Sequence, residues 1–196
     1  MNSPARGALI GCFLLLAGCA TTDRRVNILY EPSVGAKGGT GDLYLVGDRE
    51  AQGKKVQWVI GEVINNRKEQ VGNIVTDLAP AELVLDAFAA ELRSAGYRVV
   101  MSRSIPADVD KGLVLGDVSI TLREVDGLFQ SEARNKMKVA IEVWRKGVKL
   151  TKLDYETEYV DSTVRDRRRL AEETLRTSLR NFLRQAVPEI IRKLEQ

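Results

Sequence analysis

Cys19 is one of two cysteines in the chain and stands where chemistry on its thiol is expected. It follows the small-residue stretch Leu16-Ala17-Gly18, and an apolar run over 8–17 lies behind a single cation, Arg6. A cationic start, a short apolar core and small residues at the cut are the layout of a secretory signal. The run is too short to span a bilayer as a permanent helix. The sequence therefore predicts a signal over 1–18 and a mature chain that begins at Cys19.

A cleavage site of small residues that ends on a cysteine resembles the lipobox of bacterial lipoproteins. In that family the thiol receives a diacylglycerol, the chain is cut before the cysteine, and the new amine is acylated. The resemblance implies lipidation of Cys19 and lasting attachment to a membrane, since three acyl chains bind far more firmly than one. An ordinary signal with a chance cysteine is the alternative. Enterobacterial-type sorting retains lipoproteins that have aspartate directly after the lipidated cysteine and does not send them on to the outer membrane. This chain has Ala20 at that position, which predicts an outer-membrane location facing the periplasm.

The chain contains no histidine, and this excludes several catalytic classes. Ser-His-Asp and Cys-His catalysis, haem ligation by histidine and ordinary zinc sites all need that side chain. Cys12 leaves with the signal and Cys19 is consumed by lipid, so the mature fold has neither a disulfide nor a free thiol. We expect no cofactor and no metal. The formal net charge of +3, about +2 without Arg6, gives no argument for nucleic acid.

Two carboxylates could still support acid–base chemistry. Glu142 and Glu156 fall on the same outward face of two neighbouring predicted strands. Paired carboxylates hydrolyse glycans, which would suit an envelope location. Lys136, Lys138 and Lys152 share this face, however, and a solvated, salt-bridged sheet surface explains the same residues. The interpretation is therefore that the protein is not an enzyme, with a histidine-free glycan hydrolase as a weak alternative.

Trp144 is the best candidate for a binding residue. Alternation places it on the polar face just before a tight turn, where solvation alone does not favour indole. Exposed tryptophan is enriched at recognition surfaces. The sequence thus predicts a partner-binding surface formed by Trp144, Lys136, Lys138, Glu142 and Lys152. Equally, a loop or the N-terminal segment could fold over the indole.

A basic run over 165–169 lies at the start of the last predicted helix. Positive charge at a helix start opposes the helix dipole, so the run is locally unfavourable by a few tenths of a kcal/mol. It could contact anionic lipid headgroups or an acidic partner. A solvated helix end, softened by Asp166, Glu172 and Glu173, is the favoured interpretation.

The elements that position these residues follow from hydrophobic periodicity. Strands are expected at 26–30, 43–46, 56–64 (buried on both sides) and 97–100. Three long alternating strands follow and form an antiparallel meander with one wet face. In the first of these, the residues expected to face inward are Val114, Val118, Ile120 and Leu122.

Two helices complete the pattern. The first is capped by Asp77, has Pro80 in its first turn and ends at Gly96. The second spans about 164–194, with a kink or restart near Pro188. The predicted fold class is α+β: a two-layer sandwich with a mainly antiparallel sheet and both helices packed on one face. The predicted organisation is a signal over 1–18, a lipidated tether over 19–25 and a single domain over 26–196. The residues expected to be buried together are Leu85, Phe88, Leu92, Leu175, Leu179, Phe182, Val118, Ile120, Val139 and Ile141.

The whole arrangement resembles the YajG-like family of bacterial lipoproteins. The resemblance rests on the cysteine site, on Ile60-Gly61-Glu62-Val63 with its polar turn, and on the block over 83–100 followed by three strands and a helix. It implies an envelope protein and supplies no catalytic residues. We expect a non-catalytic lipoprotein that docks an envelope protein partner or supports an assembly. The alternative is a carrier that holds a lipid or other amphiphile for an envelope transporter.

Overall fold

The computed structural model describes residues 23–49 and 56–196. The signal, Cys19 and its lipidation lie outside these residues. The described elements, in chain order, are β1 (Arg24–Arg25), β2 (Asp42–Val46), β3 (Trp58–Asn65), β4 (Gln70–Thr76), α1 (Pro80–Ala95), β5 (Arg98–Ser102), β6 (Lys111–Asp126), β7 (Ser131–Arg145), β8 (Val148–Thr163) and α2 (Arg167–Glu195). Arg24 and Arg25, which the sequence assigns to the tether, thus already belong to the sheet.

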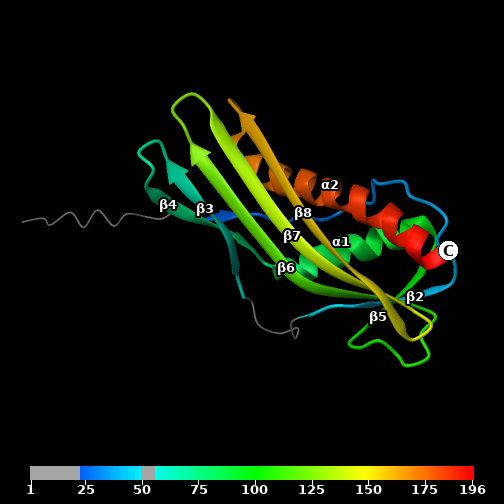
Figure 1. Cartoon of the computed structure of the whole chain (residues 1–196). Coiled ribbons are helices and arrows are strands. Elements are labelled where there is room, and N and C mark those ends of the chain that lie inside the picture. The colour runs from blue at the N-terminus through cyan, green and yellow to red at the C-terminus, as the bar shows by residue number, and fades with distance from the viewer. Residues whose placement is uncertain (1–22, 50–55) are drawn as a thin grey trace, which may run out of the picture.

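The strands form one eight-stranded sheet that curls around the helices (Figure 1). β6 is its centre: β7 pairs antiparallel along one edge, and β2 and β3 pair parallel with opposite ends of the other edge. The β1–β4 and β2–β5 pairs are also parallel. The predicted mainly antiparallel sheet is therefore wrong, because alternation identifies strands and hairpins but not the partners that distant segments choose. The fold is mixed α+β, with a curled mixed sheet in place of the expected two-layer sandwich.

The three long strands alternate as predicted, except beyond a bulge in β6. The pairing of β6 with β7 shifts between Leu115 and Val118. A bulge adds a residue to one strand and reverses the alternation beyond it. Leu113 and Leu115 are buried before the bulge, and Ile120 and Leu122 after it. Val114, predicted to face inward with Val118, therefore lies on the opposite face. The pairing of β7 with β8 also shifts, between Val143 and Trp144.

The N-terminal half departs most from the sequence predictions. Residues 26–30 form no strand, and the strand over 70–76 was not predicted. β3 is not buried on both sides, since Val59 is 64% exposed on the outward face. Helices cover only the inner face of this sheet. The apolar run over 56–64 therefore did not indicate a strand buried on both sides.

Residues 26–41 instead form an extended strap across the helices. The strap is held by Glu91 of α1, whose Oε1 accepts bonds from Tyr30 Oη (2.6 Å) and from the backbone N–H groups of Ser33 (2.7 Å) and Val34 (3.1 Å). Further along, the Gly39 N–H donates to the Ala95 carbonyl at 3.0 Å. The buried carboxylate therefore fixes the path of the chain between β1 and β2.

The helix boundaries follow partly from the predicted caps. Gly96 ends α1 at φ 116°, in the left-handed region that favours glycine. Asp77 does not cap α1: it accepts a bond from Asn27 Nδ2 at 3.1 Å and pairs with Arg25. α2 continues through Pro188 without a restart. No helix among the described residues has the length and apolar character needed to cross a membrane.

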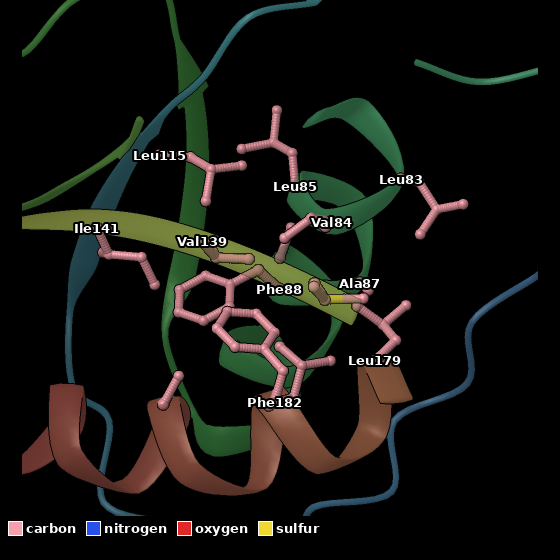
Figure 2. Packing of buried hydrophobic residues seen from close by; sticks show 14 of the residues in the cluster. Leu83, Val84, Leu85, Ala87, Phe88, Leu115, Val139, Ile141, Leu179 and Phe182 are labelled. Atoms are coloured by element: carbon pink, nitrogen blue, oxygen red, sulfur yellow. The ribbon is translucent and has the colours of Figure 1, made fainter. Parts of the chain in front are cut away.

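The core lies where α1, α2 and the inner face of the sheet meet (Figure 2). Phe88 of α1 stacks on Phe182 of α2 with ring centroids 6.1 Å apart, and Tyr155 of β8 meets Phe182 edge-on at 5.6 Å. The predicted core is confirmed except at Val118, which is only partly buried.

Replacing Phe88 with alanine should lower the free energy of unfolding by roughly 3–5 kcal/mol, because its ring is fully buried between both helices. Phe129→Ala is the matched control and should change stability by less than about 0.5 kcal/mol, since Phe129 is 85% exposed. Denaturant unfolding of both variants measures the difference. Equal losses would mean that the core does not centre on the stacked pair.

Candidate functional site

The outward face of β7 and β8 carries the predicted binding residues. Glu142 stands opposite Lys152 across the strand pair, and Lys138 stands opposite Glu156. All of these side chains project away from the helices, because they alternate with the buried residues of the same strands. The sheet therefore displays a ladder of alternating charge along its wet side.

The structure divides the predicted surface into two clusters. In the first, Trp144 Nε1 donates to Glu142 Oε2 at 3.3 Å, and Lys149 pairs with the other oxygen of Glu142. In the second, Glu156 bridges Lys136 at 2.8 Å and Lys138 at 3.2 Å. Eight positions of β7 separate Lys136 from Trp144, which is ~26 Å at ~3.3 Å per residue. The tryptophan is thus not ringed by all the predicted charges.

Trp144 is partly exposed, as a binding residue would be, and partly covered by a loop. The residue is half-buried at the end of β7 and stands opposite Gly112 of β6. A side chain at Gly112 would meet Ile105 and the Cβ of Trp144, so the loop before β6 covers this side of the face. Trp144 is therefore partly shielded and partly exposed to solvent.

A shallow groove adjoins the second cluster. It has a volume of about 370 Å³ and lies over Ala140, with a lining of Asp117, Lys138, Asp154 and Glu156. The β6 bulge places Asp117 at its rim. A groove with both charge signs suits a polar peptide or a charged side chain of a partner.

The two candidate catalytic carboxylates are far apart and firmly ionised. Glu142 and Glu156 lie in register positions about 13 Å apart along the strands. Hydrogen bonding to Lys149 holds the pKa of Glu142 below its usual range, and Lys136 does the same for the pKa of Glu156. A glycosidase acid needs a raised pKa and a second carboxylate within about 10 Å. Glu142 and Glu156 as a pair meet neither requirement.

A second polar cluster, missed from the sequence, joins the start of the fold to the β6–β7 turn. Arg24 contacts three groups: it pairs with Glu124 at 2.7 Å and with Asp126 at 2.7 Å, and donates to the Arg167 carbonyl at 2.7 Å. Ser131 Oγ donates to the other oxygen of Asp126 at 2.8 Å. Glu124 continues the inward positions of β6 after Ile120 and Leu122, and this parity was the available sign that it is buried.

Burial raises the pKa of Glu124 to about 7. The positive charge of Arg24 opposes this shift, and the negative charge of Asp126 adds to it. The side chain is fully buried, and Arg24 is its only charged partner of opposite sign among the described residues. The carboxyl group therefore changes protonation near neutral pH.

The basic run is not simply a solvated helix end. Arg167 donates through Nη1 to the Gly127 carbonyl at 2.9 Å and through Nη2 to the Leu128 carbonyl at 3.2 Å. Arg168 lines an open groove of about 540 Å³ together with Arg24 and Arg25. The acidic and apolar members of that lining are Asp23, Asp126, Val63 and Val71.

Comparisons with known proteins identify no relative by sequence: no family model and no curated protein matches the chain. Among solved structures, a DUF330 protein from Xanthomonas campestris is 8% identical over 89% of this chain and 98% of its own, with a TM-score of 0.47. A neuraminyllactose-binding hemagglutinin homolog from Helicobacter pylori is 10% identical over 85% and 91%, with a TM-score of 0.38.

A minor lipoprotein from Acinetobacter baumannii is 14% identical over 68% of this chain and 85% of its own, with a TM-score of 0.29. These neighbours thus include a bacterial lipoprotein, and none of the three is described as YajG-like. All three TM-scores fall below 0.5, so the similarities transfer no site and no activity to this chain.

The raised pKa of Glu124 makes stability depend on pH. Its folded pKa of about 7 exceeds the usual 4.5, so protonated Glu124 stabilises the fold fully below pH 4.5. This contribution is lost as the pH rises towards 7, with a slope of at most ~1.4 kcal/mol per pH unit.

Glu124→Gln removes this titration, so the stability of the native chain should fall relative to the variant between pH 4.5 and 7. Denaturant unfolding across that range measures the difference. Glu132→Gln, at an exposed position of β7, is the control and should show no such trend. A constant difference between the native chain and Glu124→Gln would show that Arg24 keeps Glu124 ionised throughout.

Proposed function

We propose that this chain is a non-catalytic lipoprotein of the bacterial outer membrane, anchored by lipid on Cys19. It faces the periplasm and docks an envelope protein partner on the outward face of β7 and β8. The observation that carries the anchoring is the position at which the fold begins. Asp23, four residues after Cys19, already accepts bonds from the backbone and side-chain nitrogens of Asn73 at 3.0 and 3.2 Å.

So short a connection keeps the domain at the membrane. Four residues extend over at most about 14 Å. A lipid on Cys19 therefore holds β1 and its neighbours close to the bilayer surface, whereas a long flexible tether would allow the domain to roam. The sequence before Cys19 and the abrupt start of the fold support the same anchored arrangement.

Packing favours docking over transport of an amphiphile. A carrier would hold its ligand between the sheet and the helices, and that space is occupied by Phe88, Phe182 and the leucines around them. The outward face offers Trp144, bonded to Glu142, and a groove of mixed charge about 13 Å away along the strands. A half-exposed tryptophan is a common anchor of protein interfaces.

Cys19→Ser should move the protein from the membrane fraction to the soluble fraction, because it removes the only thiol that can be acylated in the mature chain. Fractionation followed by metabolic labelling with a palmitate analogue measures both location and acylation. A Thr21→Ser variant, which keeps the cysteine, controls for the substitution itself. A Cys19→Ser protein recovered wholly with membranes would contradict lipid anchoring.

Trp144→Ala should weaken capture of the partner in crosslinked cells several-fold and leave the melting temperature nearly unchanged. Arg134→Ala is the matched control, because Arg134 is exposed on the same strand and lies outside the predicted binding surface; this variant should retain capture. A fall of many degrees in melting temperature would instead make Trp144 a packing residue. Equal loss of capture in both variants would place the partner across the whole face.

A further inference from the structure

The β6–β7 turn, residues 127–130, presents two large apolar side chains to solvent. Leu128 is 75% exposed and Phe129 is 85% exposed. Val164, also exposed, lies at the same end of the molecule, because Thr163 of β8 pairs with Ser131 at the start of β7. Single apolar residues scattered over a protein surface are normal and need no explanation. Two large apolar residues exposed side by side at a hairpin tip form a patch, and such patches mark contact sites.

This tip is held firmly at its base. Arg167 binds the carbonyls of Gly127 and Leu128, and Arg24 binds both Asp126 and the Arg167 carbonyl. The two bonds of Arg167 engage the backbone of the turn, and the side chains of Leu128 and Phe129 remain exposed. The start of the sheet and the start of α2 therefore position the tip jointly.

The first described residue, Asp23, lies towards this same end. β1 is parallel to β4, with Arg24 opposite Ile74, and β4 is antiparallel to β3. Going back from Arg24 to Asp23 thus leads towards Asn73 and, through β3, towards the C-terminal end of β6. Figure 1 shows the start of the described chain, the β3–β4 turn and the β6–β7 turn at one end of the molecule.

Several arginines lie at the same end of the molecule as the tip. Arg25, Arg165, Arg168 and Arg169 are all exposed at this end, and Arg24, Arg25 and Arg168 line the open groove described above. Acidic residues are present too: Asp23 and Asp126 in the groove, and Asp166 beside Arg169 at 3.9 Å. Arginines next to exposed apolar side chains match the interface of an anionic bilayer, which offers phosphates above acyl chains.

We propose that this end is a second membrane contact, in which Leu128 and Phe129 enter the headgroup region of the bilayer and the surrounding arginines bind anionic phospholipid. The inference rests on the proposed anchoring at Cys19, since the connection of about 14 Å brings the tip to the bilayer. A lipid anchor alone would leave the domain free to turn. Lipid and tip together fix it upright.

Site-specific labelling of the full, lipidated chain tests this contact. Cys19 is blocked by lipid, so a cysteine introduced by Leu128→Cys is the single free thiol and takes an environment-sensitive fluorophore. Val148→Cys is the matched control, because Val148 is 63% exposed beside the β7–β8 turn at the opposite end of the sheet. Both proteins are reconstituted into vesicles of phosphatidylethanolamine and phosphatidylglycerol.

The label at position 128 should shift to the blue and be quenched several-fold more by spin-labelled lipids than the label at 148. Phe129→Ser together with Arg168→Glu, added to Leu128→Cys, should reduce that quenching. Vesicles of phosphatidylcholine alone should also reduce it, because they carry no net negative charge.

Three results would overturn the proposal. A protein that floats with vesicles while its label at 128 remains as water-exposed as that at 148 keeps its anchor but has no tip contact. A protein that does not float at all refutes the anchoring at Cys19 as well. A label at 128 that is already shielded without vesicles shows that a second copy of the chain covers the tip.

Discussion

The apolar inner face of three long strands must be covered along its whole length, and the rest of the structure depends on this requirement. β7 has 15 residues and would extend over ~50 Å, whereas α2 has 29 residues and a length of ~43 Å. The helix therefore nearly matches the strands, and the sheet curls around it. α1 adds cover where β6 meets β2, and Phe88 and Phe182 fill the junction. The strap over 26–41 closes the outer side of the helix pair.

The buried residues of α2 change from apolar to partly polar between its C-terminal and N-terminal ends. Towards the C-terminus of α2 the buried residues are apolar, and Glu195 ties the helix end to Lys111 at 2.7 Å. Towards its N-terminus, Thr174 and Ser178 are buried with hydroxyl groups that bond no other described residue. The buried side-chain amide of Asn135 on β7 likewise bonds no other described residue. Buried polar groups without partners weaken an interface, so the start of α2 depends on the bonds of Arg167 to the β6–β7 turn.

Local pattern predicted most elements and little of their arrangement. Alternation identified β7 and β8 with the correct faces, and Gly96 marked the end of α1, because both depend on neighbours in sequence. The bulge after Leu115 reversed one strand face, and β4 carries a glycine and an asparagine that hid its apolar positions. The parallel pairs depend on contacts between distant segments. The predicted binding residues lie on one face as expected, but spacing along β7 separates Lys136 from Trp144, and no local pattern could reveal that Arg24 reaches Glu124.

The length of the central hairpin has a consequence for geometry inside the envelope. Its two ends differ in character: the 127–130 turn adjoins the start of the fold, and the β7–β8 turn lies at the far end beside Trp144. If the first end rests on the bilayer, the strands act as a strut of at most about 50 Å. Trp144 then contacts only partners that extend that far from the bilayer surface. The length of the strands thus selects partners by their distance from the membrane before any side chain is recognised.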